Sequence, residues 1–246
     1  MAELPKTLEE AVAQSMQATL AALDDGYRLL QVELAFPEIA LQAQAIAQQF
    51  IPAVQEYQLK VFFPDTGAAA LARRDWGEVP FKVDDIGSSR SPLAGKITPE
   101  DELFLVVNPS AVEVAQVEKL YNLAGDRPVV ILNPNLEDVA IVGIGLAGRQ
   151  LRERFLNKIF SCYYLRPLSA AALIRCYPEP WQVWQETTES EYKLIAETAG
   201  KPLGEALEQI LAPATQTDEP DRQQPSQQRR KGFLGQLQSF LRALSQ

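Results

Sequence analysis

The stretch from Pro128 to Pro167, PVVILNPNLEDVAIVGIGLAGRQLRERFLNKIFSCYYLRP, determines the predicted fold. It begins with an apolar strand that stops at Asn133-Pro134 and continues into a glycine cluster at 143–148. An arginine-rich segment with helical character follows, and aromatic residues close the stretch at 163–164. The order strand, glycines, helix is the local arrangement that α/β proteins use to bind phosphate groups, so the stretch bears on both fold and function.

Apolar strands and amphipathic helices alternate on the amino-terminal side of this stretch. Because the segments 103–107 and 128–132 are almost continuously apolar and are joined by a helix, they predict parallel strands covered on both faces. We therefore predict an α/β fold with a mainly parallel, Rossmann-like sheet and helices on both faces. The other expected strands are 27–36, 60–63 and 81–86, and the expected helices are 8–23, 38–51, 66–74 and 114–124.

The chain beyond the central stretch is rich in aromatic and β-prone residues. The runs CYYL (162–165), ALIRCY (172–177) and YPEPWQVWQE (177–186) predict antiparallel strands added at one edge of the sheet. Residues 191–199 and 203–211 predict two short helices. We expect one α/β domain over residues 1–211, a disordered linker over 212–228 and a basic amphipathic helix over 229–246.

Composition excludes several classes of enzyme. The chain contains no histidine, which removes the usual general base near neutral pH, the Ser-His and Cys-His nucleophile pairs and histidine metal ligands. Cys162 and Cys176 lie in aromatic and aliphatic runs and are interpreted as small buried residues of a reducing compartment. We expect no catalytic residue, no metal and no cofactor. This expectation favours a protein without enzymatic activity, and an enzymatic function is kept as the alternative.

Charge is distributed unevenly along the chain. The 32 acidic and 23 basic residues give a formal net charge of -9, which disfavours binding to nucleic acid. The beginning of the chain is acidic and lacks an apolar signal region, and no run approaches the roughly 18 apolar residues of a membrane-spanning helix. These features predict a cytoplasmic location.

The region 229–246 has the opposite charge and a helical apolar pattern. A basic amphipathic helix behind a flexible linker favours an anionic membrane surface; docking on the domain or in a partner's groove is the alternative. The predicted membrane-binding residues are Arg229, Arg230, Lys231, Phe233, Leu237, Phe240 and Leu244.

Gly143, Gly145 and Gly148 match the spacing G-x-G-x-x-G of dinucleotide-binding turns. The match lies late in the chain, and Arg166 stands near the position where an acidic residue is expected. We therefore favour a tight turn with close helix packing, and keep a dinucleotide site as the alternative.

Arginines follow the glycines directly. Arg149 and Arg152 are spaced i, i+3 at the start of the expected helix and can form an anion-attracting face. With Arg154 and Arg166 they are candidates for binding an anion or a partner protein. The alternative is a set of internal ion pairs, for example between Arg149 and Glu153.

Polar residues follow several expected strands. Asp65, Asn108, Asn133 and Asn135 stand after apolar strands, so in a parallel sheet they meet at the carboxyl edge, where open α/β sheets bind ligands. Together with the three glycines they are candidates for a ligand crevice. The alternative is that these Asn and Asp residues next to proline simply end strands.

Five motifs follow one another in the first 211 residues: KVFFPDTGAAALARRDW (60–76), RPVVILNPNL (127–136), GIGLAGRQLRERFL (143–156), YYLRP (163–167) and YPEPW (177–181). Together they resemble a domain-of-unknown-function family of cyanobacteria and plastids, which includes the plant low photosystem II accumulation protein three. The resemblance implies a photosynthesis-linked protein, with assembly of photosystem II as the expected process. The resemblance also points to nucleotides, because the same domain occurs fused to an adenylate kinase in plastids.

These observations predict a non-enzymatic accessory or assembly factor of the photosynthetic apparatus. It is expected on the cytoplasmic face of the thylakoid membrane as a peripheral protein, bound to a photosystem II assembly intermediate or another membrane protein. The alternative is a nucleotide- or phosphometabolite-binding protein or enzyme that uses the carboxyl-edge crevice.

Overall fold

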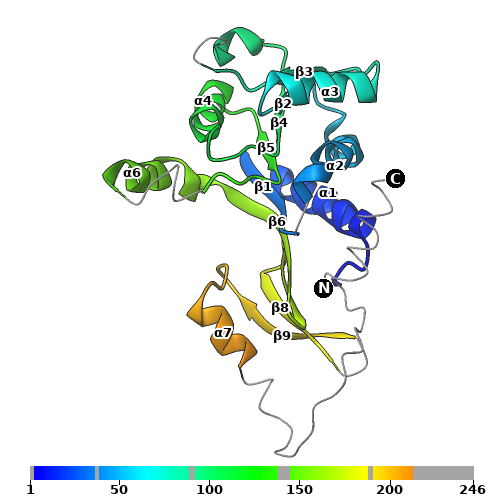
Figure 1. Cartoon of the computed structure of the whole chain (residues 1–246), viewed down its shortest axis with the longest axis vertical. Coiled ribbons are helices and arrows are strands. Elements are labelled where there is room, and N and C mark those ends of the chain that lie inside the picture. Colours follow the sequence, from blue (N-terminus) through cyan, green and yellow to red (C-terminus); the bar gives the residue numbers. More distant parts are fainter. Residues whose placement is uncertain (1–2, 37–38, 89–91, 138–144, 188–190, 213–246) are drawn as a thin grey trace, which may run out of the picture.

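The computed structural model describes residues 3–36, 39–88, 92–137, 145–187 and 191–212, and these build one nine-stranded sheet. The strand order is β3-β2-β4-β5-β1-β6-β7-β8-β9, and Figure 1 views this sheet edge-on. Neighbours from β3 to β6 pair in parallel, whereas β6 to β9 pair antiparallel. The strands are β1 (Leu29–Leu34), β2 (Leu59–Phe63), β3 (Lys82–Asp85), β4 (Leu103–Val107), β5 (Val129–Leu132), β6 (Phe160–Leu168), β7 (Ala171–Cys176), β8 (Trp181–Glu186) and β9 (Tyr192–Thr198).

Helices cover the sheet from both sides. One side, called here the α1 face, carries α1, α2 and α3, and the other, called the α4 face, carries α4, α6 and α7 (Figure 1). This arrangement confirms the predicted α/β class with a mainly parallel sheet and antiparallel strands in the C-terminal part. The helices are α1 (Leu8–Asp24), α2 (Ala43–Phe50), α3 (Thr66–Trp76), α4 (Val114–Ala124), α6 (Leu146–Arg154) and α7 (Glu205–Leu211), with short 3-10 turns η1 (Ile39–Gln42), η2 (Ile51–Val54), η3 (Leu93–Lys96) and η4 (Leu156–Lys158).

Three hydrophobic clusters hold these layers together. The largest lies on the α1 face, where Leu8 and Phe50 pack with strand residues such as Val61. A second lies on the α4 face around Phe104 and Phe155. The third, Tyr164, Leu173, Trp181 and Val183, lies beneath α7. Burying a side chain of the Leu or Phe type contributes about 1.5–3 kcal/mol, so these clusters are the main source of stability.

Asn108 and Asn133 end the two buried strands β4 and β5 by the same backbone device. Their φ angles are 51° and 50°, in the left-handed region that asparagine tolerates better than most residues. The Asn133 backbone N–H donates to the Val32 carbonyl, and its side-chain Oδ1 accepts from the Leu34 N–H at 2.9 Å. Asn133 therefore ties the end of β5 to the end of β1.

Two sequence predictions about local structure differ from the result. The predicted helix at 38–51 is, over the described residues, 3-10 turn η1, then α2, then 3-10 turn η2. The helix predicted at 191–199 is wrong, because this segment forms β9 and pairs antiparallel with β8 from Tyr192 to Thr198. Pairing along a whole strand outweighs the intrinsic helix preference of its Lys, Leu, Ala and Glu residues.

None of the helices in the described part of the chain has the length and hydrophobicity needed to span a lipid bilayer. The predicted tail helix and nearly all of the predicted linker, residues 213–246, lie outside the described residues.

We predict that Asn133→Ala lowers the free energy of unfolding by about 1–3 kcal/mol, because the buried Leu34 N–H loses its acceptor. Left-handed strain at an alanine adds to this loss. Urea denaturation followed by circular dichroism measures the change. Asn135→Ala is the matched control: its side chain is exposed, and we expect it to stay within about 0.5 kcal/mol of the parent. Equal stabilities of the two variants would contradict the role of Asn133.

Candidate functional site

The central strand β1 is apolar on one face and polar on the other. Leu30, Val32 and Leu34 belong to the cluster on the α1 face. Gln31 and Glu33 alternate with them and therefore face the α4 side, where both are half-buried. The adjacent strand β5 and the strand beyond it, β4, are by contrast buried at every residue. β1 is thus an interior strand that keeps polar side chains on one face.

Strand β6 continues this polar surface. In the parallel register Gln31 stands beside Ser161 and Glu33 beside Tyr164, with a shift of register between Gln31 and Val32. Arg166 follows two residues after Tyr164 and is exposed. The α4 face of β1 and β6 therefore presents a row of polar groups in the middle of the sheet.

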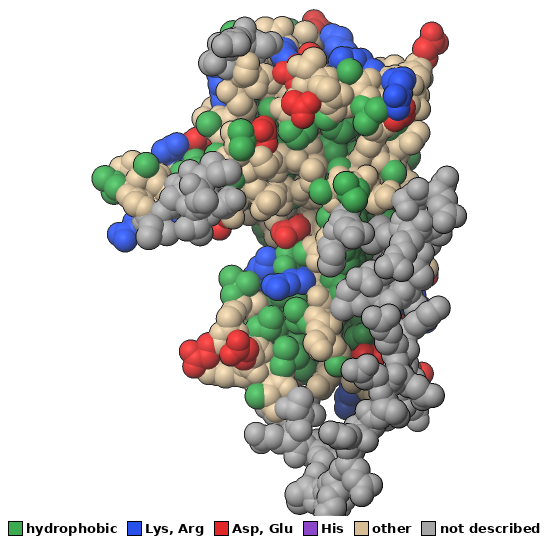
Figure 2. Space-filling model, in the orientation of Figure 1, with side chains coloured by type: hydrophobic (Ala, Val, Ile, Leu, Met, Phe, Trp, Pro, Cys, Tyr) green, Lys and Arg blue, Asp and Glu red, His purple; other side chains and the backbone are tan. Residues whose placement is uncertain are grey.

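The helices on the α4 face leave this row uncovered. α6 packs on α4 through Leu151 and Phe155 and extends away from the sheet, while α7 packs on the cluster of β6–β8 (Figure 1). Figure 2 shows a deep hollow between these two parts of the surface, with acidic and basic side chains meeting inside it. We name this feature the polar notch and define it by Gln31, Glu33, Tyr164, Arg166 and Lys201.

Lys201 is held in place by aromatic rings. Its Nζ lies 3.7 Å from the centre of the Tyr164 ring and 5.6 Å from that of Trp181. Burial lowers the pKa of Lys201, and the attraction of Glu33 opposes this change. Cation–π contact of this kind stabilises a partly desolvated ammonium group, so the charge of Lys201 stays at a fixed position.

Glu33 is the acidic group of the notch floor. Burial raises its pKa, while Lys201, the Gln31 amide and Arg166 lower it without cancelling that effect. The Gln31 Nε2 donates to a Glu33 carboxyl oxygen at 2.7 Å. Burial also raises the pKa of Tyr164 to about 12, so its hydroxyl is protonated at neutral pH. Within the described ranges, Glu33, Arg166 and Lys201 form no ion pair of 4.0 Å or less.

The four arginines predicted as a binding set lie in two different places. Arg166 lies on the sheet in the polar notch, whereas Arg149, Arg152 and Arg154 lie on α6. Arg149 is exposed, and Arg152 is half-buried. Arg154 forms a two-pronged ion pair with Glu118 of α4, at 2.6 and 3.0 Å, so it joins α6 to α4.

The residues predicted to form a carboxyl-edge crevice follow β2, β4 and β5. The chain leaves β2 through α3 on the α1 face and leaves β4 through α4 on the opposite face, which is the topological switch point of an open α/β sheet. Asp65 accepts the Ala68 N–H at 2.9 Å and so caps α3, and Asn108 is half-buried. The Asn133 Oδ1 accepts a hydrogen bond from the Leu34 N–H, and Asn135 pairs with Ser110 in an isolated parallel β-bridge.

The glycine motif is partly visible. Gly145 stands at the cap position before α6 and is exposed, and Gly148 is buried within that helix. Gly143 lies outside the described residues.

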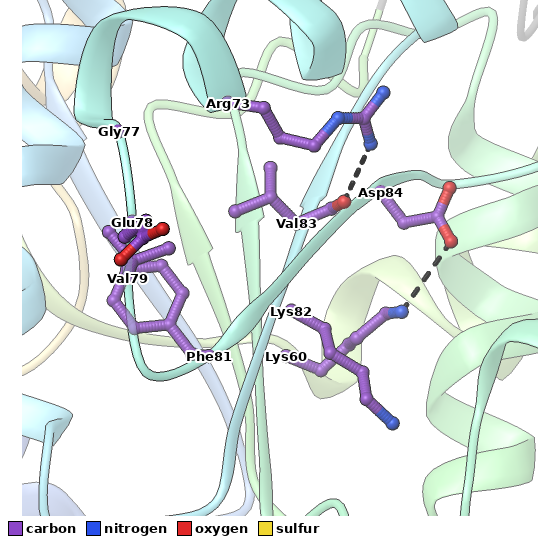
Figure 3. Close-up of a pocket in the computed structure, with 9 residues that line it drawn as sticks. All are labelled: Lys60, Arg73, Gly77, Glu78, Val79, Phe81, Lys82, Val83 and Asp84. Carbon is purple, nitrogen blue, oxygen red and sulfur yellow. Dashed lines mark hydrogen bonds and ion pairs between the residues drawn. The ribbon is translucent and has the colours of Figure 1, made fainter.

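A second hollow, of about 670 Å³, lies beside the edge strand β3 and is shown in Figure 3. Lys60, whose side chain is 5% exposed, approaches Asp84 at 3.5 Å, and Lys96 approaches Asp85 at 2.6 Å. The Arg73 guanidinium donates to the Val83 carbonyl at 2.8 Å. These contacts neutralise the buried charges and cap a backbone group of the edge strand, which is a structural use.

The described residues offer few side chains for binding a metal ion or for thiol chemistry. There, no cluster of three or more Cys, Asp or Glu side chains is arranged to hold a metal ion. The Cys162 thiol donates to the Gln31 carbonyl at 3.3 Å on the opposite side of the sheet from the notch. Burial raises the pKa of Cys162 to about 12, so it is a protonated thiol at neutral pH.

Sequence reasoning missed Gln31, Glu33 and Lys201 as members of one site. The available signal was the alternation of LLQVEL at 29–34, which marks a strand with one polar face in the middle of an otherwise apolar sheet. Lys201 gave no such signal, because the aromatic rings that hold it come from β6 and β8.

Residues 5–209 match the sequence-family model described as Domain of unknown function (DUF1995). The matched range contains all nine strands and extends into α7.

We predict that Glu33→Gln raises the melting temperature at pH 7. A carboxyl group whose pKa is raised above 4.5 by folding favours the folded state below pH 4.5 and loses this contribution as the pH rises through its folded pKa. The gain from Glu33→Gln should therefore shrink as the pH falls toward 4. Scanning calorimetry at several pH values measures this gain, with the exposed Glu56→Gln, which lies away from the notch, as a control expected to show little change. A lower melting temperature for Glu33→Gln at pH 7 would show that the carboxylate stabilises the fold.

Proposed function

The chain belongs to the DUF1995 family, whose function is unknown, and we propose that this protein is a non-enzymatic accessory or assembly factor of the photosynthetic apparatus. It binds a photosystem II assembly intermediate or another membrane protein through the polar notch. Its tail attaches it as a peripheral protein to the cytoplasmic face of the thylakoid membrane.

The observation that carries this proposal is the uncovered α4 face of β1 and β6. Small-molecule sites enclose most of their ligand, whereas this hollow is open to solvent along its side (Figure 2). Its charged groups are close together without being paired within 4.0 Å among the described residues. An open surface with fixed charges of both signs suits recognition of a protein segment, in which charge complementarity gives specificity.

The absence of histidine in the sequence supports a role without catalysis, because a protein of this composition lacks the usual general base. The photosynthetic context is supported by the motifs that resemble the family of cyanobacteria and plastids. Membrane attachment is supported by the pattern of basic and apolar residues over 229–246.

A second candidate function is binding of a nucleotide or phosphometabolite. The switch point between β2 and β4, with Asp65 and Asn108 beside it, favours this alternative, because ligands of doubly wound sheets bind at that place.

We predict that the full chain sediments with thylakoid membranes and that a truncation to residues 1–228 stays in the supernatant. Each basic residue near an anionic surface contributes about 1 kcal/mol, and the apolar stripe adds its burial. A full-length control with Phe233, Leu237 and Phe240 replaced by serine keeps the basic residues and should lose most of the binding. Equal membrane recovery of the full chain and the truncation would refute the role of the tail.

For the second candidate, the expected result is no increase in melting temperature with millimolar ATP, ADP or inorganic phosphate. A ligand present at 100 times its dissociation constant stabilises a protein by about 2.7 kcal/mol, so specific binding would be visible in a thermal-shift assay. Clear stabilisation that Asp65→Ala removes would favour the nucleotide function over the accessory role.

A further inference from the structure

We propose that the polar notch binds an acidic peptide segment of the partner protein, with Arg166 and Lys201 receiving its carboxylates. This inference rests on the proposed function and adds the chemistry of the segment that is recognised.

The two cations of the notch are placed to receive an anionic group. Arg166 is exposed on β6, and Lys201 lies above the ring of Tyr164 from the same strand. Both cations lie close enough to Glu33 to lower its pKa against the effect of burial, but neither has a carboxylate partner within 4.0 Å in the described part of the chain. A guanidinium and a fixed ammonium group are the donors that proteins use for carboxylates.

The cation Lys201 is ready to bind without reorganising. Its contacts with Tyr164 and Trp181 fix its position, whereas a surface lysine loses rotamer freedom when it pairs. A group that is already ordered reduces the entropy lost on association. The aromatic rings beneath Lys201 therefore belong to the recognition surface, although they do not need to touch the peptide.

Glu33 limits which ligands the notch accepts. Its half-buried carboxyl group lies next to the cations, and its own hydrogen bond goes to Gln31 at 2.7 Å. An ionised Glu33 repels an incoming carboxylate and attracts the same cations. Removing its charge should therefore strengthen binding, a change opposite in sign to the loss of either cation.

Apolar side chains lie on the elements on both sides of the hollow. Leu146 begins α6 and is 72% exposed, and Leu203 precedes α7 and is 58% exposed. α6 and α7 lie on opposite sides of the hollow, and an apolar residue of a bound segment that contacts either leucine would add burial energy to the charge contacts. The segment that fits best carries acidic residues next to apolar ones.

The charge of the whole chain makes this local attraction selective. With a formal net charge of -9, most of the protein repels an acidic segment. Among the described residues, the notch brings together two cations that lack an ion-pair partner within 4.0 Å, and charge complementarity of this kind suppresses wrong contacts.

The test is fluorescence anisotropy of the full chain with a labelled octapeptide of alternating Leu and Glu, with a Leu-Lys octapeptide as the comparison. We expect Arg166→Gln and Lys201→Gln each to weaken Leu-Glu binding about tenfold or more. Glu33→Gln should tighten it, and the exposed Lys82→Gln at the β3 edge should change it less than twofold. Lys201→Arg keeps the charge and should retain binding, which separates an electrostatic effect from a folding defect.

The inference is overturned if the Leu-Glu peptide does not bind at millimolar concentration, or if the Leu-Lys peptide binds as well. It is also overturned if neither Arg166→Gln nor Lys201→Gln weakens binding, or if inorganic phosphate or ADP displaces the peptide at micromolar concentration, which would mark a small-anion site. If the peptide does not bind but the full chain still sediments with membranes, only the proposed role of the notch is refuted. If the peptide binds but the full chain does not sediment with membranes, only the proposed role of the tail is refuted.

Discussion

Each interior strand of a parallel sheet has two faces, and an apolar face must be covered by another layer. On the α1 face of this protein the hydrophobic cluster extends from β2 across the sheet to β7 beneath α1, α2 and α3. On the α4 face one cluster joins β2, β4, β5 and Leu29 at the start of β1, and the other joins β7, β8 and Tyr164 of β6. Between the two clusters, β1 and β6 carry Gln31, Glu33 and Arg166 on this face, so the polar part of β1 matches the gap in the helical layer. The candidate function lies at that gap.

The edges of the sheet are treated differently from its middle. At β3 the Arg73 side chain donates a hydrogen bond to the Val83 backbone carbonyl. Lys60 and Lys96 form ion pairs with Asp84 and Asp85 of the same strand. Such charged, partly occupied edges discourage the addition of a foreign strand. A partner segment therefore finds its open surface on the α4 face, where the side chains have fixed positions and the backbone is already paired within the sheet.

The strands that are buried along their whole length could be predicted from the sequence. β4 and β5 are continuous apolar runs that end at Asn-Pro, and the parallel sheet follows from them. The tertiary pairing of β9 with β8 could not be read from a segment rich in helix-forming residues, so its type was predicted wrongly. Asn108 and Asn133 directly follow β4 and β5, as the strand pattern indicated, but the Asn133 side chain bonds to β1, a contact with a residue 99 positions away in the sequence. The notch combines residues of β1, β6 and the segment before α7. Of these, Arg166 was a predicted binding residue, and the alternation within β1 was a further signal in the sequence.

The central claim is that the gap over β1 and β6 is the recognition surface. Its most direct test is backbone amide chemical-shift mapping of the isotopically labelled full chain titrated with the Leu-Glu octapeptide. The account predicts that the largest shifts cluster at residues 31–35, 164–168 and 201–203. Shifts concentrated at Asp65 and Asn108, or around Lys60 and Lys82 at the β3 edge, would contradict it.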